Sequence, residues 1–253
     1  MKNLFIQLIF AGSVLCMAHI EILAQNKWTQ KPVSQWKQIA LINNVKFTDA
    51  KYNNPYAGSA FLLDTGKEIV AVTAKHVLLL AKSKPMTSVH FKGTLKEWAF
   101  HPKGDSTKPI IAKELVNTDI NEKLNPAKLM NKDCIVFSLK DVPKHIQALK
   151  LRNTPIQPNE TVYVIGCPYV DKSCVQNVYK GKFVRTQGVN LLVRLENAQL
   201  NLGGMSGGAV IDKNGKVVGV VSRMLRDSKT KEVLLAPIST NYLKKVLKQY
   251  KKM

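Results

Sequence analysis

Acidic residues and arginine are scarce in this sequence. Of its 253 residues only 17 are Asp or Glu, against 38 Lys and Arg, which gives a formal net charge of +21. Only 5 of the 38 basic residues are Arg, and they do not cluster with interleaved aromatic residues. Nucleic-acid readers rely on such clusters, so we predict no nucleic-acid partner. The scattered lysines predict a solvated cationic surface, with weak association with anionic surfaces as a secondary consequence.

Long hydrophobic runs are missing after the first two dozen residues, which excludes a membrane span there. At the start, Lys2 precedes an apolar stretch over residues 4–18, and the small residue Ala24 ends the segment. This pattern is typical of a cleaved signal peptide over residues 1–24, although Ile22 is bulkier than the residue usually found at that position. A retained membrane anchor is the alternative. We therefore predict a secreted or periplasmic protein.

Cysteine is rare, with four in the chain. Cys16 falls within the predicted signal peptide. Cys167 and Cys174 could close a small disulfide in an oxidising compartment or remain two free thiols. Cys134 lies in an apolar run, which is typical of a buried small hydrophobic residue. These spacings exclude a cysteine metal site, and we predict neither a metal nor a cofactor.

No repeat, low-complexity tract or Gly/Ser linker interrupts the chain. What recurs is a short apolar run, often β-branched, closed by turn residues, and such runs predict strands. They cover residues 58–63, 68–73, 88–92, 134–139, 161–166, 179–186, 189–195, 209–211, 217–222 and 232–237. Many short strands indicate an all-β sandwich or a pair of barrels. Only residues 240–252 carry apolar residues at helical spacing, which predicts a C-terminal α-helix.

The glycine-rich segment 203–210, Gly-Gly-Met-Ser-Gly-Gly-Ala-Val, carries the strongest chemical signal. A serine hydroxyl becomes a good nucleophile when a base takes its proton, and the oxyanion that then forms needs backbone N–H donors. Gly204 and Ser206 can supply these donors if the loop adopts dihedral angles that glycine tolerates. We therefore predict that Ser206 is a nucleophile. The alternative for this segment alone is a glycine-rich turn between strands.

A base and an acid are predicted at the ends of two other strands. His76 follows the predicted strand 68–73 after one tight turn, and imidazole suits both base and acid work near neutrality. Asp133 directly precedes the run 134–139, where its carboxylate can accept the second N–H of the histidine and orient the ring. Taken alone, His76 is better explained as a structural histidine and Asp133 as a strand-edge charge.

Together these segments resemble the chymotrypsin-like (trypsin-fold) serine peptidases, bacterial trypsin-like peptidase domains in particular. The chain order His, Asp, Ser is that of the family. The resemblance covers residues 55–250 and includes Gly-Ser-Ala-Phe at 58–61 and the hairpin 214–220. It implies that Ser222 hydrogen-bonds the catalytic aspartate.

The resemblance also implies an all-β fold of two six-stranded antiparallel β-barrels, with the active site between them and a C-terminal α-helix. We expect a signal peptide at 1–24, an N-terminal segment at 25–54 that is either a strand-forming lead-in or a propeptide, and the peptidase domain at 55–253, with barrels at about 55–145 and 146–238 and the helix at 240–252.

The chain departs from the family pattern at several positions. Met205 stands where zymogens of the family carry an aspartate that pairs with a new N-terminus, and no Arg/Lys-Ile-Val-Gly-Gly start is present. This favours the bacterial branch, which includes the high-temperature-requirement proteases. Lys75 stands where relatives often have a small residue, and Ala209 replaces a frequent proline. We expect Lys75 to face solvent; an inward lysine would disfavour the charged form of His76.

Substrate preference is implied by the same resemblance. Leu200 is expected near the base of the primary specificity pocket, and Ser222, Arg223 and Met224 are expected to form one wall. These residues include no carboxylate that would bind Lys or Arg, so we expect a preference for apolar or small residues. The alternative is that Arg223 recruits acidic residues.

We therefore predict a secreted serine endopeptidase that hydrolyses polypeptide substrates through an acyl-enzyme. His76, Asp133 and Ser206 would form the triad, and the N–H groups of Gly204 and Ser206 the oxyanion hole. The alternative is a catalytically silent trypsin-fold binding protein with a cationic surface, and a serine esterase on the same fold is a further one. The sequence does not indicate the oligomeric state or the physiological substrate.

Overall fold

A computed structural model of the chain describes residues 28–142, 144–197 and 201–250. The chain divides into two compact units, one ending at Trp36 and the other beginning at Lys37. The first unit contains the short 3-10 helices η1 (Trp28–Gln30) and η2 (Val33–Gln35). Within it the rings of Trp28 and Trp36 meet edge to face, with centroids 4.8 Å apart.

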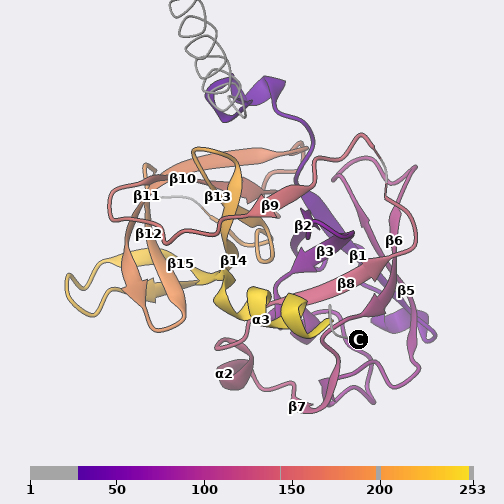
Figure 1. Ribbon diagram of the computed structural model, residues 1–253. Coiled ribbons are helices and arrows are strands. Elements are labelled where there is room, and N and C mark those ends of the chain that lie inside the picture. The colour runs from indigo at the N-terminus through magenta and orange to yellow at the C-terminus, as the bar shows by residue number, and fades with distance from the viewer. Residues whose placement is uncertain (1–27, 143, 198–200, 251–253) are drawn as a thin grey trace, which may run out of the picture. The chain divides into compact units, whose positions relative to one another are not determined.

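Six antiparallel strands of the second unit close a first β-barrel (Figure 1). They are β1 (Leu41–Phe47), β2 (Ser59–Asp64), β3 (Ile69–Thr73), β5 (Leu95–His101), β6 (Ile110–Leu115) and β8 (Ile135–Leu139). Each pairs with the next in the order β1-β5-β6-β8-β3-β2, and β2 pairs again with β1. Phe47, Trp98, Phe100 and Phe137 belong to its core. β4 (Ser88–Val89) and β7 (Asp119–Lys123) form a separate two-stranded sheet.

The first strand of this barrel comes from residues 25–54, the segment that the sequence analysis set before the domain. β1 buries most of its side chains, including that of Asn43, which is fully buried. The side-chain amide of Asn43 donates to the carbonyl groups of residues 57–59 at 3.0–3.1 Å, so its polar atoms are satisfied in the core. Because Asn43 and Asn44 interrupt the apolar run, the pattern did not predict this strand.

Six further antiparallel strands close a second barrel. They are β10 (Thr161–Gly166), β11 (Asn177–Gln187), β12 (Asn190–Leu195), β13 (Ala209–Asp212), β14 (Lys216–Arg226) and β15 (Val233–Ser239). The pairings complete the ring β10-β11-β12-β15-β14-β13. The short strand β9 (Leu149–Leu151) pairs in parallel with β2 and with β14, and so joins the two barrels. The predicted all-β fold of two six-stranded barrels is confirmed.

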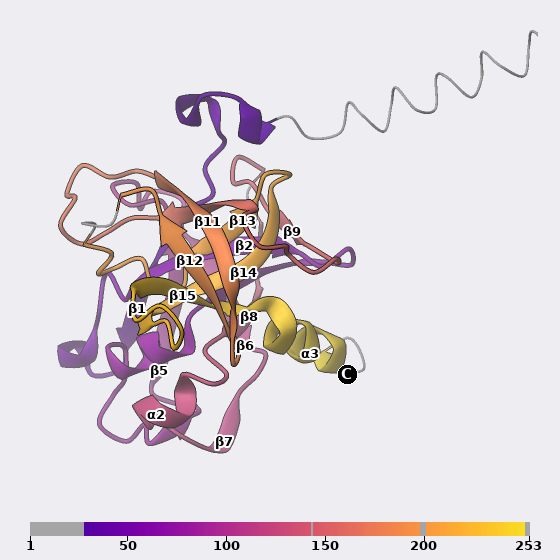
Figure 2. The same ribbon diagram turned by 90° about the vertical axis from the view of Figure 1, so that its left-hand side faces the viewer.

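Among the residues that the structure describes, the helices are short except for the last one. α2 (Pro126–Leu129), η3 (Ala50–Tyr52) and η4 (Lys75–Leu79) lie in loops of the first barrel. The predicted C-terminal helix is α3 (Thr240–Tyr250), which buries Leu243, Val246 and Leu247. In both views α3, in yellow, lies beside β14 (Figures 1 and 2). Residues 251 and 252 of the predicted helix lie outside the described residues.

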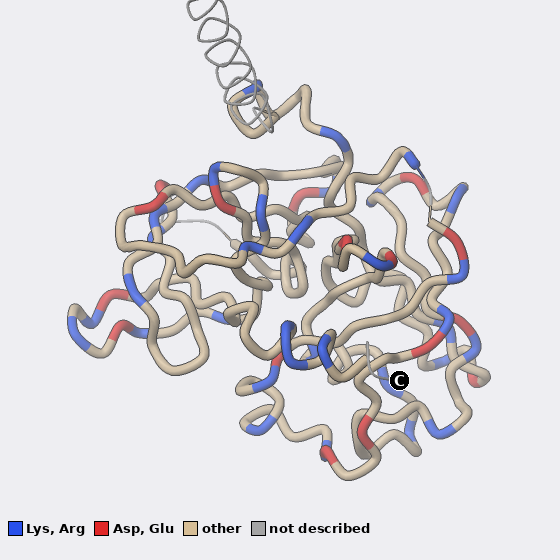
Figure 3. The backbone as a smooth tube through the Cα atoms, in the orientation of Figure 1, with Lys and Arg blue, Asp and Glu red and all other residues tan. Residues whose placement is uncertain are grey.

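Lysine and arginine are distributed over both barrels (Figure 3). Within the described ranges, no helix is long and apolar enough to cross a membrane. The predicted signal peptide, residues 1–24, lies outside these ranges, so secretion stays a prediction.

Candidate active site

Three polar side chains from the two barrels meet at one point. His76 lies in η4, directly after β3, and Asp133 lies just before β8. β3 and β8 are paired with Thr73 opposite Ile135, which brings these two segments together. Ser206 precedes β13 of the second barrel. The structure thus brings together the three residues that the sequence analysis selected as nucleophile, base and acid.

Hydrogen bonds connect these side chains in one continuous series. His76 Nε2 lies 2.8 Å from Ser206 Oγ, and His76 Nδ1 lies 2.7 Å from Asp133 Oδ2. The backbone N–H of His76 donates to Asp133 Oδ1 at 2.8 Å. Ser222 Oγ donates to Asp133 Oδ2 from the opposite barrel. The carboxylate therefore holds both the ring and the backbone of His76, and the second ring nitrogen faces the serine.

The environment of Asp133 keeps its carboxyl group ionised. The residue is fully buried. Burial alone acts to raise the pKa of Asp133, but the hydrogen bond from His76, the charge of His76 and the hydrogen bond from Ser222 together hold that pKa below its ordinary value. An ionised carboxylate in this position can stabilise an adjacent imidazolium.

The loop around Ser206 takes a backbone path that requires glycine. Gly204 and Gly207 have φ angles of +97° and +91°, which side-chain-bearing residues rarely adopt. A Cβ atom at Gly207 would also collide with the carbonyl oxygen of Ser59. The carbonyl of Ser206 accepts a hydrogen bond from the N–H of Ser59 at 2.8 Å. Among the described residues, none accepts a hydrogen bond from the N–H groups of Gly204 and Ser206, the two predicted oxyanion donors.

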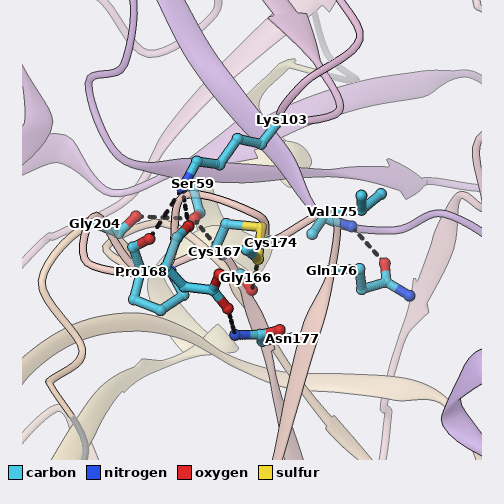
Figure 4. Close-up of a disulfide and its surroundings, with 12 residues drawn as sticks. Ser59, Lys103, Gly166, Cys167, Pro168, Cys174, Val175, Gln176, Asn177 and Gly204 are labelled. Atoms are coloured by element: carbon cyan, nitrogen blue, oxygen red, sulfur yellow. Dashed lines mark hydrogen bonds between the residues drawn. A yellow bond between two sulfur atoms is a disulfide. The ribbon is translucent and has the colours of Figure 1, made fainter.

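A disulfide between Cys167 and Cys174 closes a loop that packs against the glycine segment (Figure 4). Within this loop the N–H of Tyr169 donates to the carbonyl of Gly203 at 2.7 Å. The ring of Tyr169 lies so near Gly204 that a Cβ atom there would come within 2.9 Å of it. The disulfide loop therefore supports the backbone that carries a predicted oxyanion donor.

First-barrel residues hold this loop from the other side. Lys103 Nζ donates to the carbonyl of Pro168 at 3.2 Å, and Figure 4 shows the lysine reaching over the loop. The hydroxyl of Tyr56 donates to the carbonyl of Cys167. The ring of Tyr56 also meets that of Tyr169 edge to face, with centroids 4.6 Å apart. These supporting residues come from distant parts of the chain, and no local sequence pattern indicated them.

Met205, the residue before Ser206, is fully buried in the core of the second barrel. Its N–H donates to the carbonyl of Leu202 at 3.0 Å. An apolar side chain packed in this way holds the segment without an ion pair to a new N-terminus.

The expectation that Lys75 faces solvent is wrong. Its side chain is fully buried, and Nζ lies 2.7 Å from Glu122 Oε2 of β7. The same nitrogen lies 3.3 Å from the hydroxyl of Tyr242 in α3 and 5.0 Å from the centroid of that ring. A buried ammonium group needs such partners. They lie 47 and 167 residues away along the chain, so the local pattern could not indicate them.

Ser222 and Arg223, two of the residues predicted to form a wall of the specificity pocket, hydrogen-bond to other residues of the protein. Leu200 lies outside the described residues. The hydroxyl of Ser222 is bonded to Asp133. Arg223 Nη2 donates to Asn190 Oδ1 at 2.9 Å, which directs the guanidinium group toward the start of β12.

Met224 is 48% exposed and borders a small cavity of about 40 Å³. Leu195, Leu202 and Leu235 are among its lining residues, together with the polar residues Arg194, Asn197 and Glu232. Leu235 is the cross-strand partner of Met224. No local sequence pattern indicated these leucines, because they come from separate segments that meet only in the folded barrel.

Within the described residues, Cys134 and the acidic residues do not form a metal site. Cys134 is free and buried, and burial raises the pKa of its thiol. In the part of the chain that the structure describes, no three His, Cys, Asp or Glu residues are grouped to hold a metal ion.

Comparison with known proteins agrees with this geometry. The family model described as "Trypsin-like peptidase domain" matches residues 58–220, which include His76, Asp133 and Ser206. No curated protein sequence is significantly similar to the chain. Among solved structures, the serine endoprotease from Yersinia pestis has the same fold, with a TM-score of 0.55 and 18% sequence identity over 85% of this chain. The matched region spans 64% of that protein's length. The chain therefore belongs to the family of trypsin-like peptidase domains, which are serine hydrolases of the chymotrypsin-like fold.

Proposed function

We propose that this protein is a secreted serine endopeptidase in which Ser206 is the nucleophile, His76 the general base and acid, and Asp133 the orienting carboxylate. The observation that carries the proposal is the unbroken series of hydrogen bonds from Asp133 through His76 to Ser206, with distances of 2.7 and 2.8 Å. Such a series lets imidazole take the serine proton while the carboxylate stabilises the imidazolium.

The reaction would proceed by acyl transfer. Ser206 Oγ attacks the carbonyl carbon of the scissile peptide bond as its proton passes to His76 Nε2. The tetrahedral intermediate collapses when His76 returns this proton to the leaving amine, which leaves an acyl-enzyme. Water, deprotonated by His76, then attacks the ester carbon and releases the acid product and free Ser206.

The developing oxyanion would bind to the backbone N–H groups of Gly204 and Ser206. Two such donors supply a large part of the rate enhancement in acyl transfer. This part of the proposal is supported by the lack of an acceptor for either group among the described residues and by the positive φ of Gly204.

An apolar or small residue is the proposed preference on the acyl side of the scissile bond. The cavity beside Met224 is lined mainly by apolar side chains. Glu232 also borders it, but Arg194 binds both carboxylate oxygens, with Nε at 2.9 Å and Nη2 at 2.5 Å. A carboxylate paired in this way is a poor partner for a substrate Lys or Arg.

An extracytoplasmic location is part of the proposal. It rests on the signal-peptide pattern at residues 1–24. The disulfide between Cys167 and Cys174 supports it, because disulfides persist in oxidising compartments.

Hydrolysis of casein and of a fluorogenic peptide library by the mature chain, residues 25–253, tests the proposal. We expect cleavage after apolar or small residues, and Ser206→Ala should lower the turnover number by about 10⁶-fold, as for other triads. Hydrolysis of small esters without hydrolysis of casein would instead indicate an esterase. Equal activity of the alanine variant and the wild type would contradict the proposal, and an inactive wild type would favour a silent binding protein.

A further inference from the structure

A groove of about 580 Å³ lies between the second barrel and α3, apart from the triad. Its volume falls within the range of small-molecule and peptide sites, about 300–1,000 Å³. Apolar side chains that line it are Ile156, Val189, Leu191, Val218 and Ile238. Leu191, Val218 and Ile238 are buried, so the exposed apolar surface comes from Val189, which is 38% exposed, Pro155 and the half-buried Ile156. The groove therefore offers apolar surface that a ligand can cover.

Four basic residues from separate parts of the chain also line the groove: Lys132, Arg152, Lys244 and Lys245. No Asp or Glu is among its lining residues within the described part of the chain. Figure 3 shows the lysines of α3 as blue segments. The groove thus combines an apolar strip with polar lining residues, and its charged lining residues are all basic.

The lysines of the groove differ from its arginine in how their charge is balanced. Arg152 is bound by Glu160 at 2.7 Å and by Asp212 at 3.3 Å, so its charge is compensated. Lys132, Lys244 and Lys245 form no ion pair with any residue that the structure describes. Three cations directed at one concave surface raise the local concentration of an anionic ligand.

The shape and chemistry of the groove favour a peptide over a membrane. A flat bilayer surface cannot reach an apolar floor that lies between a barrel and a helix. An extended peptide can enter it, place an apolar side chain on Val189 and Ile156, and set carboxylates beside the lysines. The side chains of Asn153 and Asn241 also line the groove and can bond to peptide groups.

We propose that this groove binds an acidic peptide segment that carries an apolar side chain. The site is separate from the proposed catalytic one, because none of the three triad residues lines the groove. It comes near the triad at two points, through Lys132, which directly precedes Asp133, and through Tyr242, which contacts the buried Lys75 next to His76. An occupant would therefore lie beside the segments that carry His76 and Asp133.

Fluorescence anisotropy with the Ser206→Ala mature chain tests the site without cleavage of the probe, so the result does not depend on the proposed activity. The probe is a fluorescein-labelled peptide of alternating Glu and Leu. Lys244→Gln/Lys245→Gln should weaken its binding about fivefold or more, because two exposed ion pairs are lost. A probe with Ser in place of Leu should bind about tenfold more weakly, because the apolar contact is lost.

The matched control is Lys82→Gln/Lys84→Gln, which removes the same charge from exposed lysines outside the groove. It should change the affinity by less than about twofold. Equal weakening by both double variants, or none by either, would show that the probe binds the general cationic surface and would overturn the proposal. Phosphatidylglycerol vesicles form the second arm. If vesicles lose binding in Lys244→Gln/Lys245→Gln while the peptide does not, the groove is a lipid contact and the proposal fails.

Discussion

A serine hydroxyl has little nucleophilicity of its own, so the reactivity proposed for Ser206 depends on the side chains behind it. The last member of the hydrogen-bonded series is Ser222, whose hydroxyl donates to the carboxylate of Asp133. This bond is one of the factors that hold the pKa of Asp133 down. We therefore propose that Ser222 is a positioning residue, which acts on Ser206 through two other side chains.

Ser222→Ala should lower kcat/KM for peptide substrates about tenfold, because a hydrogen bond to a buried carboxylate contributes on the order of 1.5–3 kcal/mol. Steady-state kinetics over pH 5–9 measure the effect. The control is Ser88→Ala, since the hydroxyl of Ser88 is buried without a hydrogen-bond partner within the described part of the chain. Unchanged kinetics in Ser222→Ala would contradict the role assigned to this bond.

Lys75 also acts at the scale of single residues, through a buried ion pair that links the segment of His76 to β7. Lys75→Met should reduce the free energy of unfolding by about 3 kcal/mol, because Glu122 is left without its partner in a largely buried site. Urea denaturation measures this change. Lys75→Met/Glu122→Gln removes both charges and should recover most of the loss. A single variant as stable as the wild type would refute the argument.

Among the elements, the disulfide loop 167–174 supports the backbone of Gly203 and Gly204, and the N–H of Gly204 is one of the two predicted oxyanion donors. Cys167→Ala/Cys174→Ala should cost about 2–3 kcal/mol of stability, as expected for a short closed loop. It should also lower kcat more than it changes KM, because Gly203 and Gly204 lose part of their support. Kinetics and denaturation of the variant test both effects.

Dithiothreitol provides an independent check of the same loop. It should lower the activity of the wild type and leave Cys167→Ala/Cys174→Ala unchanged, because the remaining thiol, Cys134, is already reduced and buried. Loss of activity in both proteins would mean that the loop is not the target of the reductant.

We expect the turn between β14 and β15 to make the free energy of unfolding depend on pH in the acidic range. Asp227 accepts a hydrogen bond from Arg185 at 2.6 Å and one from the N–H of Lys229 at 2.7 Å. These bonds, that of Arg185 foremost, lower the pKa of Asp227 to about 2. A lowered pKa adds stability above the unfolded-state value of about 3.9, and this contribution is lost as the pH falls through the folded-state value.

Asp227→Asn should therefore melt at a lower temperature than the wild type at pH 7, and the difference should shrink between pH 4 and pH 2. Thermal unfolding of both proteins over this range measures it. A difference in melting temperature that does not vary with pH would show that the stabilisation by Asp227 does not depend on the charge of its carboxylate.

Whether a strand was predicted from the sequence depended on whether charged residues interrupt its apolar run. Strands with a nearly continuous apolar run, such as β3 and β8, were predicted within one residue or so. β5 and β6 were missed because charged pairs, Lys96-Glu97 and Lys113-Glu114, interrupt their apolar residues. Residues 88–92 were predicted as one strand, and the structure has only Ser88–Val89 there.

The candidate site was predictable where its chemistry is local. The turn of His76, the carboxylate before β8 and the glycines around Ser206 each carry a pattern in a few adjacent residues. The partners that support them do not. Tyr169 meets the glycine segment, and Glu122 of β7 meets Lys75, only through contacts between segments that are far apart in the chain.

At the scale of the whole molecule, the two barrels divide the proposed chemistry between them. The first barrel supplies His76 and Asp133, and the second supplies Ser206 and Ser222. β9 pairs with a strand of each barrel, and the bond from Ser59 to the carbonyl of Ser206 crosses the same boundary. The geometry of the triad is therefore a property of how the barrels are joined.

Labelling of the mature chain with a fluorophosphonate probe, beside Ser206→Ala and the control Ser88→Ala, tests the central claim most directly. Such probes phosphonylate a serine only when a base has activated it. The account predicts labelling of the wild type and of Ser88→Ala, and none of Ser206→Ala. Absence of labelling in the wild type, or labelling that persists in Ser206→Ala, would contradict it.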